Sequence, residues 1–118
     1  MCSSDLNAPA GEFTSISGGY HNFCALDTDG YANCWGMRPE VNNPPREVLA
    51  ALDSYDGNAC GLRQDGSLLC WGDDAGVRSS VPSGSFVQVS LGARMACAVD
   101  GDGRVSCWGT DAVEPDAL

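Results

Sequence analysis

Cysteine is the residue type in this 118-residue sequence whose number and spacing most clearly suggest chemistry, and the sequence contains seven cysteines. Six form three pairs whose members always lie ten positions apart: Cys24 with Cys34, Cys60 with Cys70, and Cys97 with Cys107. Cysteines that face one another across antiparallel strands can be joined by a disulfide. Because cross-strand bridging accounts for the constant separation, we predict three disulfides, with packed free thiols as the alternative.

The predicted disulfides bear on both stability and location. On the chain-entropy model, closing a loop of about 11 residues stabilises the fold by roughly 2.5–3 kcal/mol. Such bonds persist in oxidising surroundings, so we expect the protein to be extracellular or periplasmic. A zinc site is disfavoured, because the sequence has one histidine and no Cys-x-x-Cys pair. We therefore expect neither a metal nor a cofactor.

Other side chains that could act chemically have structural explanations that fit them better. No nucleophile or carboxylate partner is marked for His21, so we interpret it as a structural, hydrogen-bonding residue. The segments Asp27–Gly30 and Asp100–Gly103 resemble the start of a calcium loop but lack its later ligands, which favours tight turns, with weak calcium binding as the alternative. The neighbouring carboxylates of Asp73 and Asp74 would point apart on a strand, so we expect a solvated loop there. No catalytic residue is predicted.

An internal repeat organises the chain. The tripeptide Cys-Trp-Gly occurs three times at steps of 36 and 37 residues, and an Asp-Gly pair precedes each copy. The recurring tryptophans and turn glycines are Trp35, Trp71 and Trp108 with Gly30, Gly66 and Gly103. Glycine supplies the positive φ that a tight hairpin turn needs at little cost. We predict that the glycines shape turns and that the tryptophans pack in the interior, in preference to forming a carbohydrate-stacking row.

Each stretch between paired cysteines reads as a β-hairpin. Opposing Cys24 with Cys34 also opposes Phe23 with Trp35, and the same register can be written in the other two repeats. The cysteines then share one face of the hairpin with an aliphatic pair, while the tryptophan and its partner take the other face. Since both faces are largely apolar, both should be covered by neighbouring repeats. A short segment with an aliphatic residue and a serine, such as Phe13–Ser17, adds a strand before the hairpin.

Three or four short strands per repeat, stacked face to face, predict an all-β fold of β-propeller blades, with a β-solenoid as the alternative. We place the repeats at 7–36, 37–72 and 73–109, and assign 110–118 to the start of a further unit or a tail. The turn-rich stretch Asp73–Pro82 could hold one short edge strand, and no helix of usable length is evident. We interpret residues 1–6, which include the seventh cysteine Cys2, as a non-native leader derived from a sequencing adapter, in preference to a lipidated Cys2 or an intermolecular disulfide.

These features resemble the regulator of chromosome condensation repeat family, in its secreted bacterial branch. The segment Phe13–Leu26, the Asp-Gly pairs and the Cys-Trp-Gly copies carry the resemblance, which extends over 9–109. The second copy departs from the pattern, with Leu49 at the phenylalanine position and Gly57 at the histidine position. The resemblance implies part of a larger propeller, seven-bladed in the family, that binds proteins. Family activities toward a small GTPase or β-lactamases depend on loops outside the repeat pattern and are not carried over.

Composition disfavours several classes of partner. The chain has 16 acidic and 6 basic residues and a net charge of −10, so it should repel nucleic acid. Its 15 glycines and 6 prolines argue against a helical bundle. No apolar run approaches the roughly 18 residues that a membrane-spanning helix needs.

We therefore expect a non-enzymatic module that binds a protein through its loops, with Met37–Asn43 and Asp73–Ser80 as candidate contact segments. One alternative is the accessory part of a secreted carbohydrate-active enzyme, whose chemistry needs two positioned carboxylates. Another is a glycan or cell-surface adhesion module.

Three repeats are fewer than the roughly four blades of the smallest closed ring. The open faces should bind further blades of a longer chain or cause self-association.

Overall fold

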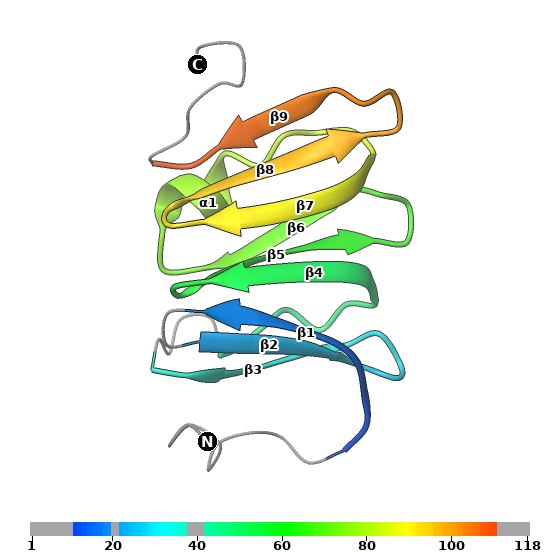
Figure 1. Cartoon of the computed structure of the whole chain (residues 1–118), viewed down its shortest axis with the longest axis vertical. Helices are drawn as coiled ribbons and strands as arrows, with labels where there is room; N and C mark the ends of the chain where they lie inside the picture. Colours follow the sequence, from blue (N-terminus) through cyan, green and yellow to red (C-terminus); the bar gives the residue numbers. More distant parts are fainter. Residues whose placement is uncertain (1–10, 20–21, 38–41, 111–118) are drawn as a thin grey trace.

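The computed structural model describes residues 11–19, 22–37 and 42–110, which form three antiparallel sheets of three strands each. The strands are β1 (Phe13–Gly19), β2 (Asn22–Asp27), β3 (Ala32–Gly36), β4 (Leu49–Tyr55), β5 (Asn58–Arg63), β6 (Leu68–Gly72), β7 (Phe86–Gly92), β8 (Met95–Asp100) and β9 (Val105–Trp108). We refer to the sheets as units 1, 2 and 3 in chain order. Figure 1 shows them stacked one above another, with units 1 and 3 at opposite ends. The all-β prediction of stacked propeller blades is confirmed.

Strand pairing follows the register written from the cysteine spacing. In unit 1, Cys24 lies opposite Cys34 and Phe23 opposite Trp35. The predicted pairs in the other units, such as Cys60 with Cys70, are also present. All three pairs of opposed cysteines are joined by disulfides, with Cα atoms 4.0–4.1 Å apart. The spacing of ten residues therefore does correspond to cross-strand bridging.

The turn that joins the two strands of each hairpin depends on its glycine. Gly30, Gly66 and Gly103 have φ of +90°, +87° and +86°, in the left-handed region that side chains other than glycine rarely adopt. Each of these glycines donates its N–H to the carbonyl three residues earlier, at 2.9–3.0 Å. The conformation and the hydrogen bond together reverse the chain within a few residues, which keeps the two cysteines in register.

The units pack through two chemically different faces. We call the face that carries the disulfide the cysteine face, and the face that carries the tryptophan and its cross-strand partner the tryptophan face. Cys24 and Leu26 of unit 1 form a buried cluster with Leu49, Ala59 and Trp71 of unit 2. The cysteine face of unit 2 forms a second cluster with Phe86, Val89, Ala96 and Trp108 of unit 3. Both junctions thus place a cysteine face on a tryptophan face, as the apolar character of both faces predicts.

Hydrogen bonds reinforce both junctions. The Gly30 carbonyl accepts the N–H of Leu49 at 2.8 Å, and the Gly66 carbonyl accepts the N–H of Phe86 at the same distance. On the first strands, Ser17 Oγ accepts the N–H of Ser54 at 3.1 Å. One junction therefore repeats the other in its polar contacts as well as in its apolar ones.

A short helix, α1 (Ala75–Ser79), lies where the sequence suggested an edge strand. The expectation for Asp73–Pro82 was therefore wrong. Asp74 has an extended backbone and its carboxylate accepts the N–H of Val77 at 3.1 Å, which makes it the N-cap. A helix of five residues has little stability of its own, so contacts with the rest of the fold must hold it in place. No helix of the described residues is long and apolar enough to cross a membrane.

Candidate functional site

The segment around α1 belongs to the predicted contact segment Asp73–Ser80, and hydrogen bonds hold it against the sheets. Asp74 is the centre of the hydrogen bonds that fix the first turn. Besides accepting from Val77, its carboxylate accepts the Thr110 hydroxyl at 2.8 Å, and its N–H donates to Asn58 Oδ1 at 3.0 Å. The carbonyl of Asp74 also accepts the N–H of Arg78 at 3.2 Å. Thr110 follows the last strand of unit 3, whereas Asn58 begins β5 of unit 2. The first turn of α1 is thus held by two different units.

The far side of α1 is held by a tryptophan. Val77 is fully buried in the cluster between units 2 and 3, and its carbonyl accepts the indole N–H of Trp108 at 2.9 Å. Ala75, Arg78 and Ser79 are exposed on the opposite side of the helix. Figure 1 places α1 at one edge of the stack, beside β8. The helix therefore presents a small polar surface on a rigid support.

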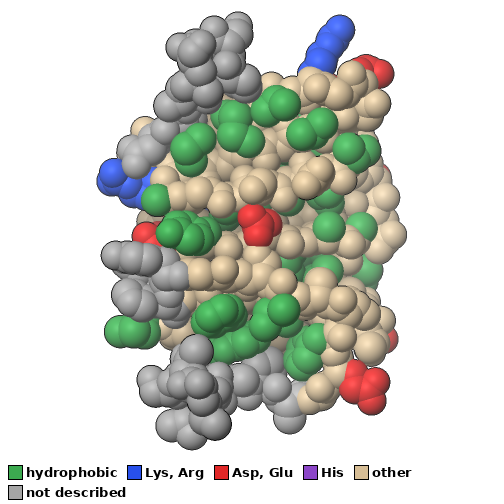
Figure 2. Space-filling view, in the orientation of Figure 1, with side chains coloured by type: hydrophobic (Ala, Val, Ile, Leu, Met, Phe, Trp, Pro, Cys, Tyr) green, Lys and Arg blue, Asp and Glu red, His purple; other side chains and the backbone are tan. Residues whose placement is uncertain are grey.

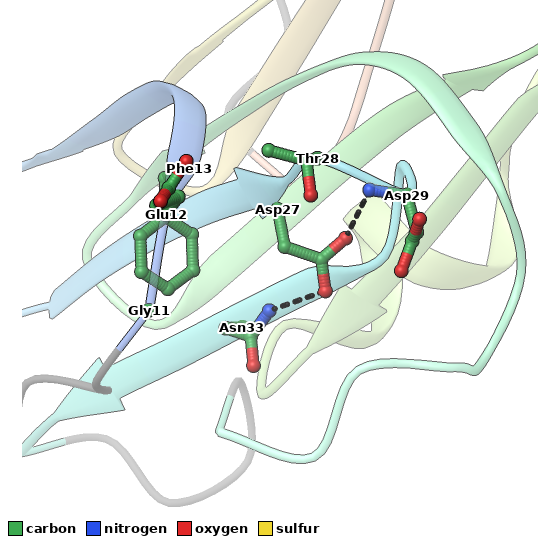
Figure 3. Close-up of a pocket in the computed structure, with 7 residues that line it drawn as sticks. All are labelled: Gly11, Glu12, Phe13, Asp27, Thr28, Asp29 and Asn33. Atoms are coloured by element: carbon green, nitrogen blue, oxygen red, sulfur yellow. Dashed lines mark hydrogen bonds between the residues drawn. The ribbon is translucent and has the colours of Figure 1, made fainter.

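A second candidate lies at the turn between β2 and β3. Gly11, Glu12, Phe13, Asp27, Thr28, Asp29 and Asn33 line a pocket of about 220 Å³. Figure 3 shows the Asp27 carboxylate turned toward Asp29 and Asn33. One carboxylate oxygen accepts the N–H groups of Asp29 and Tyr31 at 2.9 and 3.0 Å. Hydrogen bonding, first from the Tyr31 N–H and then from Asp29 and Asn33, lowers the pKa of Asp27.

This pocket is a product of turn chemistry. In unit 3, Asp100 occupies the position of Asp27 and accepts the N–H groups of Asp102 and Arg104 in the same way, at 2.9 and 3.0 Å. Carboxylate oxygens that bind backbone N–H groups are directed at the chain instead of a cation. Among the residues that the structure describes, no group of three histidines, cysteines or acids is placed to hold a metal.

The equivalent turn of unit 2 is stabilised by different side chains. Arg63 replaces the aspartate and forms an ion pair with Glu47, its Nε lying 2.7 Å from Glu47 Oε1. The hydrogen bond to Arg63 lowers the pKa of Glu47, and the bond from the Ser67 N–H lowers that of Asp65. The Asp65 carboxylate also accepts the Ser67 hydroxyl at 2.7 Å. The aspartates of these turns thus accept hydrogen bonds that stabilise the turns, and this role explains their presence.

The tryptophans occupy equivalent positions with unequal exposure. Trp71 and Trp108 are buried at the two junctions between units, so neither can stack on a sugar. Trp35 lies on the end face of unit 1, where its ring stacks on that of Phe23 with centroids 5.9 Å apart. The three rings therefore form no continuous exposed row.

Several predicted positions fall outside the described residues. These are His21, Cys2 with the rest of 1–6, residues 7–10 at the start of the first repeat, 38–41 within the predicted contact segment Met37–Asn43, and 111–118 of the predicted further unit or tail. Within that segment, Asn42 donates to the Gly36 carbonyl at 3.0 Å and accepts from Asn22 at 3.3 Å. Asp74, expected in a solvated loop, instead caps α1.

Sequence reasoning missed the buried asparagines and the polar contacts between units. Asn22 and Asn58, each the first residue of its middle strand, are almost completely buried. Asn58 binds the backbone of Asp74 and Asn22 binds Asn42, so both attach the segment that leads to the next unit. Asn22 and Asn58 are 36 residues apart, which equals the first repeat step, so the sequence did indicate that they hold equivalent positions in the first two repeats.

Residues 13–37 and 86–112, in units 1 and 3, match the family described as regulator of chromosome condensation (RCC1) repeat. No curated protein sequence matches the chain with significance.

Solved structures of similar fold include two plant receptor ectodomains. The ectodomain of the receptor kinase CR4 from Physcomitrella patens is 28% identical, with a TM-score of 0.71, over 82% of this chain and 29% of that one. The CRINKLY WD40 ectodomain of the receptor kinase ACR4 from Arabidopsis thaliana is 29% identical, with a TM-score of 0.68, over 85% and 37%. Prp20p from Saccharomyces cerevisiae shares the fold at 19% identity and a TM-score of 0.66, over 83% and 33%. The chain spans about a third of the length of these structures.

Proposed function

We propose that this chain, which carries repeats of the regulator of chromosome condensation type, is a non-enzymatic, protein-binding segment of an extracellular β-propeller. The single observation that carries the proposal is the support of α1. Its first turn is bound to two units and its Val77 carbonyl to Trp108, while Ala75, Arg78 and Ser79 stay exposed. A polar surface fixed before binding loses little conformational entropy when a partner docks.

Two observations support a location outside the cytosol. The three disulfides would be reduced in most cytosols but persist in an oxidising compartment. The two most identical of the structures compared above are ectodomains of receptor kinases. An extracellular or periplasmic setting fits both observations.

Protein is the partner class that the surface favours. The net charge of −10 opposes docking on a phosphate backbone. Burial of Trp71 and Trp108 removes the row of rings that a glycan would need. Yeast Prp20p, which has the same fold, binds Gsp1p and histones, so the fold is compatible with protein recognition.

The test is site-specific photo-crosslinking from α1. A photoreactive residue replaces Ser79 in the oxidised chain, which is then exposed to secreted proteins of the source organism. The captured protein is identified, purified and titrated against the wild-type chain and the variant Arg78→Glu. We expect Arg78→Glu to weaken binding by roughly tenfold or more, because it reverses the charge at the centre of the exposed helix surface.

Arg104→Glu is the matched control, since Arg104 is also exposed but lies in the turn between β8 and β9. It should bind the captured protein as the wild type does. Equal losses in the two variants would place the effect in overall charge and contradict a contact at α1. Binding on a glycan array, or hydrolysis of a polysaccharide by the chain, would favour the adhesion or enzyme alternatives.

A further inference from the structure

Three positions beside the hairpin turn differ between the two junctions, although the frame around them is the same. In both junctions the first residue of a unit donates its N–H to the turn glycine of the unit before it, at 2.8 Å. At the junction of units 2 and 3 all three positions are serine, whereas the junction of units 1 and 2 has an aromatic, a basic and an aliphatic residue. The corresponding residues are Tyr31 and Ser67, Arg46 and Ser83, and Val48 and Ser85. Because serines are compatible with the frame at one junction, the larger side chains at the other need a different explanation.

The aromatic and the basic side chain are stacked. The guanidinium carbon of Arg46 lies 4.2 Å from the centre of the Tyr31 ring. A cation over the face of an aromatic ring is attracted by the electrons of the ring. A stacked guanidinium still directs its N–H groups outward, in the plane of the fork that matches a carboxylate.

The backbone of both residues is held in place. The Tyr31 N–H donates to Asp27 Oδ1 at 3.0 Å, and the Tyr31 carbonyl accepts the Asp27 N–H at the same distance. Arg46 follows two prolines, whose rings restrict the backbone before it. Leu49, three residues later, is buried and bonded to the turn of unit 1. The guanidinium is therefore positioned before any partner arrives, which lowers the entropy cost of binding.

The charge of Arg46 is not neutralised within the described part of the chain. Arg46 is exposed, and its interaction there is with the Tyr31 ring. The adjacent carboxylate of Glu47 instead pairs with Arg63, at 2.7 Å. Exposed cations are scarce on a chain with 16 acidic and 6 basic residues, and on the face drawn in Figure 2 the basic side chains lie at the margins. A fixed, unpaired guanidinium on such a chain is suited to an anionic group from outside.

An apolar side chain adjoins this cation. Val48 is 41% exposed and lies against the turn of unit 1, since a Cβ on Gly30 would be 2.9 Å from Val48 Cγ1. Figure 1 shows the turn between β2 and β3 on the opposite side of the stack from α1. A further blade stacked on unit 1 would leave this region accessible, because Arg104, at the position of Tyr31 in unit 3, is exposed although unit 2 is stacked on unit 3.

We propose that Tyr31, Arg46 and Val48, which we call the stacked-arginine surface, bind an acidic segment of a partner protein. Two N–H groups of Arg46 donate to the carboxylate of an aspartate or glutamate of the partner, and an aliphatic residue beside that carboxylate packs on Val48. A peptide carboxylate fits this surface better than a nucleic acid, because a single guanidinium faces it and the net charge of the chain is −10. The stacked-arginine surface is separate from α1, so it does not depend on binding at the helix.

Selection from a random peptide library tests the proposal. Dodecapeptides displayed on phage are selected on the immobilised, oxidised chain, and the selected peptides are synthesised and titrated by fluorescence anisotropy. We expect the selected peptides to be enriched in aspartate or glutamate beside an aliphatic residue, relative to the unselected library. Higher salt should weaken their binding, because the contact is between exposed charges.

The variants take their residues from the other junction. Arg46→Ser, Tyr31→Ser and Val48→Ser introduce the side chains that the second junction already carries, so the fold should tolerate them. We expect Arg46→Ser to weaken peptide binding by at least about tenfold, and Tyr31→Ser and Val48→Ser by about threefold each. Arg46→Lys should restore part of the loss, since lysine keeps the charge but not the planar fork. Circular dichroism establishes that each variant is folded, and Arg46→Gln replaces Arg46→Ser if it is not.

Arg104→Ser is the matched control, because it removes the same charge from another exposed arginine, and it should bind the peptides as the wild type does. Failure to select any peptide, or selected peptides without enriched carboxylates, would overturn the proposal. So would equal binding by the wild type and a folded Arg46→Ser variant. Peptides that lose binding in Arg78→Glu and keep it in Arg46→Ser would assign recognition to α1, which would support the proposed function and contradict the stacked-arginine surface.

Discussion

The side-chain oxygen of Ser17 accepts the backbone N–H of Ser54 at 3.1 Å, although the residues are 37 positions apart. The Ser54 hydroxyl in turn donates to the Ser17 carbonyl at 3.0 Å. These reciprocal bonds tie the first strand of unit 1 to the first strand of unit 2. Asp53, beside Ser54, accepts the Ser17 hydroxyl and also the N–H of Leu91 in unit 3. One carboxylate therefore bonds to both of the neighbouring units.

Replacing Asp53 with alanine should weaken the whole stack. The variant leaves the N–H of Leu91 and the hydroxyl of Ser17 without their acceptor, and hydrogen bonds to charged groups contribute roughly 1.5–3 kcal/mol. We expect a loss of about that size in the free energy of unfolding, measured by urea denaturation with the disulfides intact.

Ser90→Ala is the control for Asp53→Ala, because Ser90 holds the same position in unit 3 but is exposed. Both variants are measured at a concentration at which the chain is monomeric, since self-association would add to the apparent stability. Equal losses in the two variants would contradict the role assigned to Asp53.

The Asp27 turn should make stability depend on acidity. The pKa of Asp27 in the folded protein is lowered, chiefly by the hydrogen bond from the Tyr31 N–H. The ionised carboxylate therefore stabilises the fold fully at a pH above the ordinary pKa of about 3.8. This stabilisation is lost as the pH falls through the lower pKa of the folded state. Asp27→Asn retains an acceptor but cannot titrate. Unfolding followed from pH 5 downward should therefore show a shallower acid loss in this variant than in the wild type. Asp29→Asn, in the same turn, should follow the wild-type profile; an equally shallow loss there would assign the effect to net charge.

Much of the fold follows from one spacing. Ten residues between Cys24 and Cys34, with Gly30 between them, fix the hairpin register, and that register fixes which side chains share a face. Because both faces of each sheet carry apolar cross-strand pairs, both faces must be covered, and this requires the sheets to stack on one another. All of this information is local to about a dozen residues, which is why it can be read from the sequence.

The parts that sequence reasoning missed depend on residues brought together by the stack. α1 is too short to form by propensity, and the indole that binds Val77 comes from 31 residues further along the chain. The bond between Asp53 and Leu91 spans 38 positions and exists only when units 2 and 3 are stacked. The local signal for a helix start was Asp74, an aspartate at the N-cap position that is followed three residues later by the apolar Val77.

Removing the indole N–H should loosen α1 selectively. In Trp108→Phe, the Val77 carbonyl loses its donor while most of the ring remains, at a cost of about 1–3 kcal/mol. Amide hydrogen exchange should accelerate across Ala75–Ser79 more than in β5 and β6. Trp71→Phe is the control, because Trp71 is buried at the other junction; faster exchange in α1 there as well would argue against a specific bond.

Gly76 should not tolerate alanine, despite the higher helix propensity of alanine. A Cβ at this position would lie 2.7 Å from the backbone nitrogen of Thr110, closer than such atoms approach. We expect Gly76→Ala to lower the melting temperature and to disturb the bond between Thr110 and Asp74. Ala75→Gly, one position earlier on the exposed side, should cost only the difference in propensity, about 1 kcal/mol. A Gly76→Ala protein as stable as the wild type would contradict the tight approach of α1 to the end of β9.

The pairing of the six cysteines tests the stacked, disulfide-clamped architecture most directly. The chain is produced in an oxidising compartment, digested without reduction and analysed by mass spectrometry. We predict three linked peptides, which join Cys24 to Cys34, Cys60 to Cys70 and Cys97 to Cys107. Linkage between cysteines of different units, or six free thiols in protein from that compartment, would contradict the account.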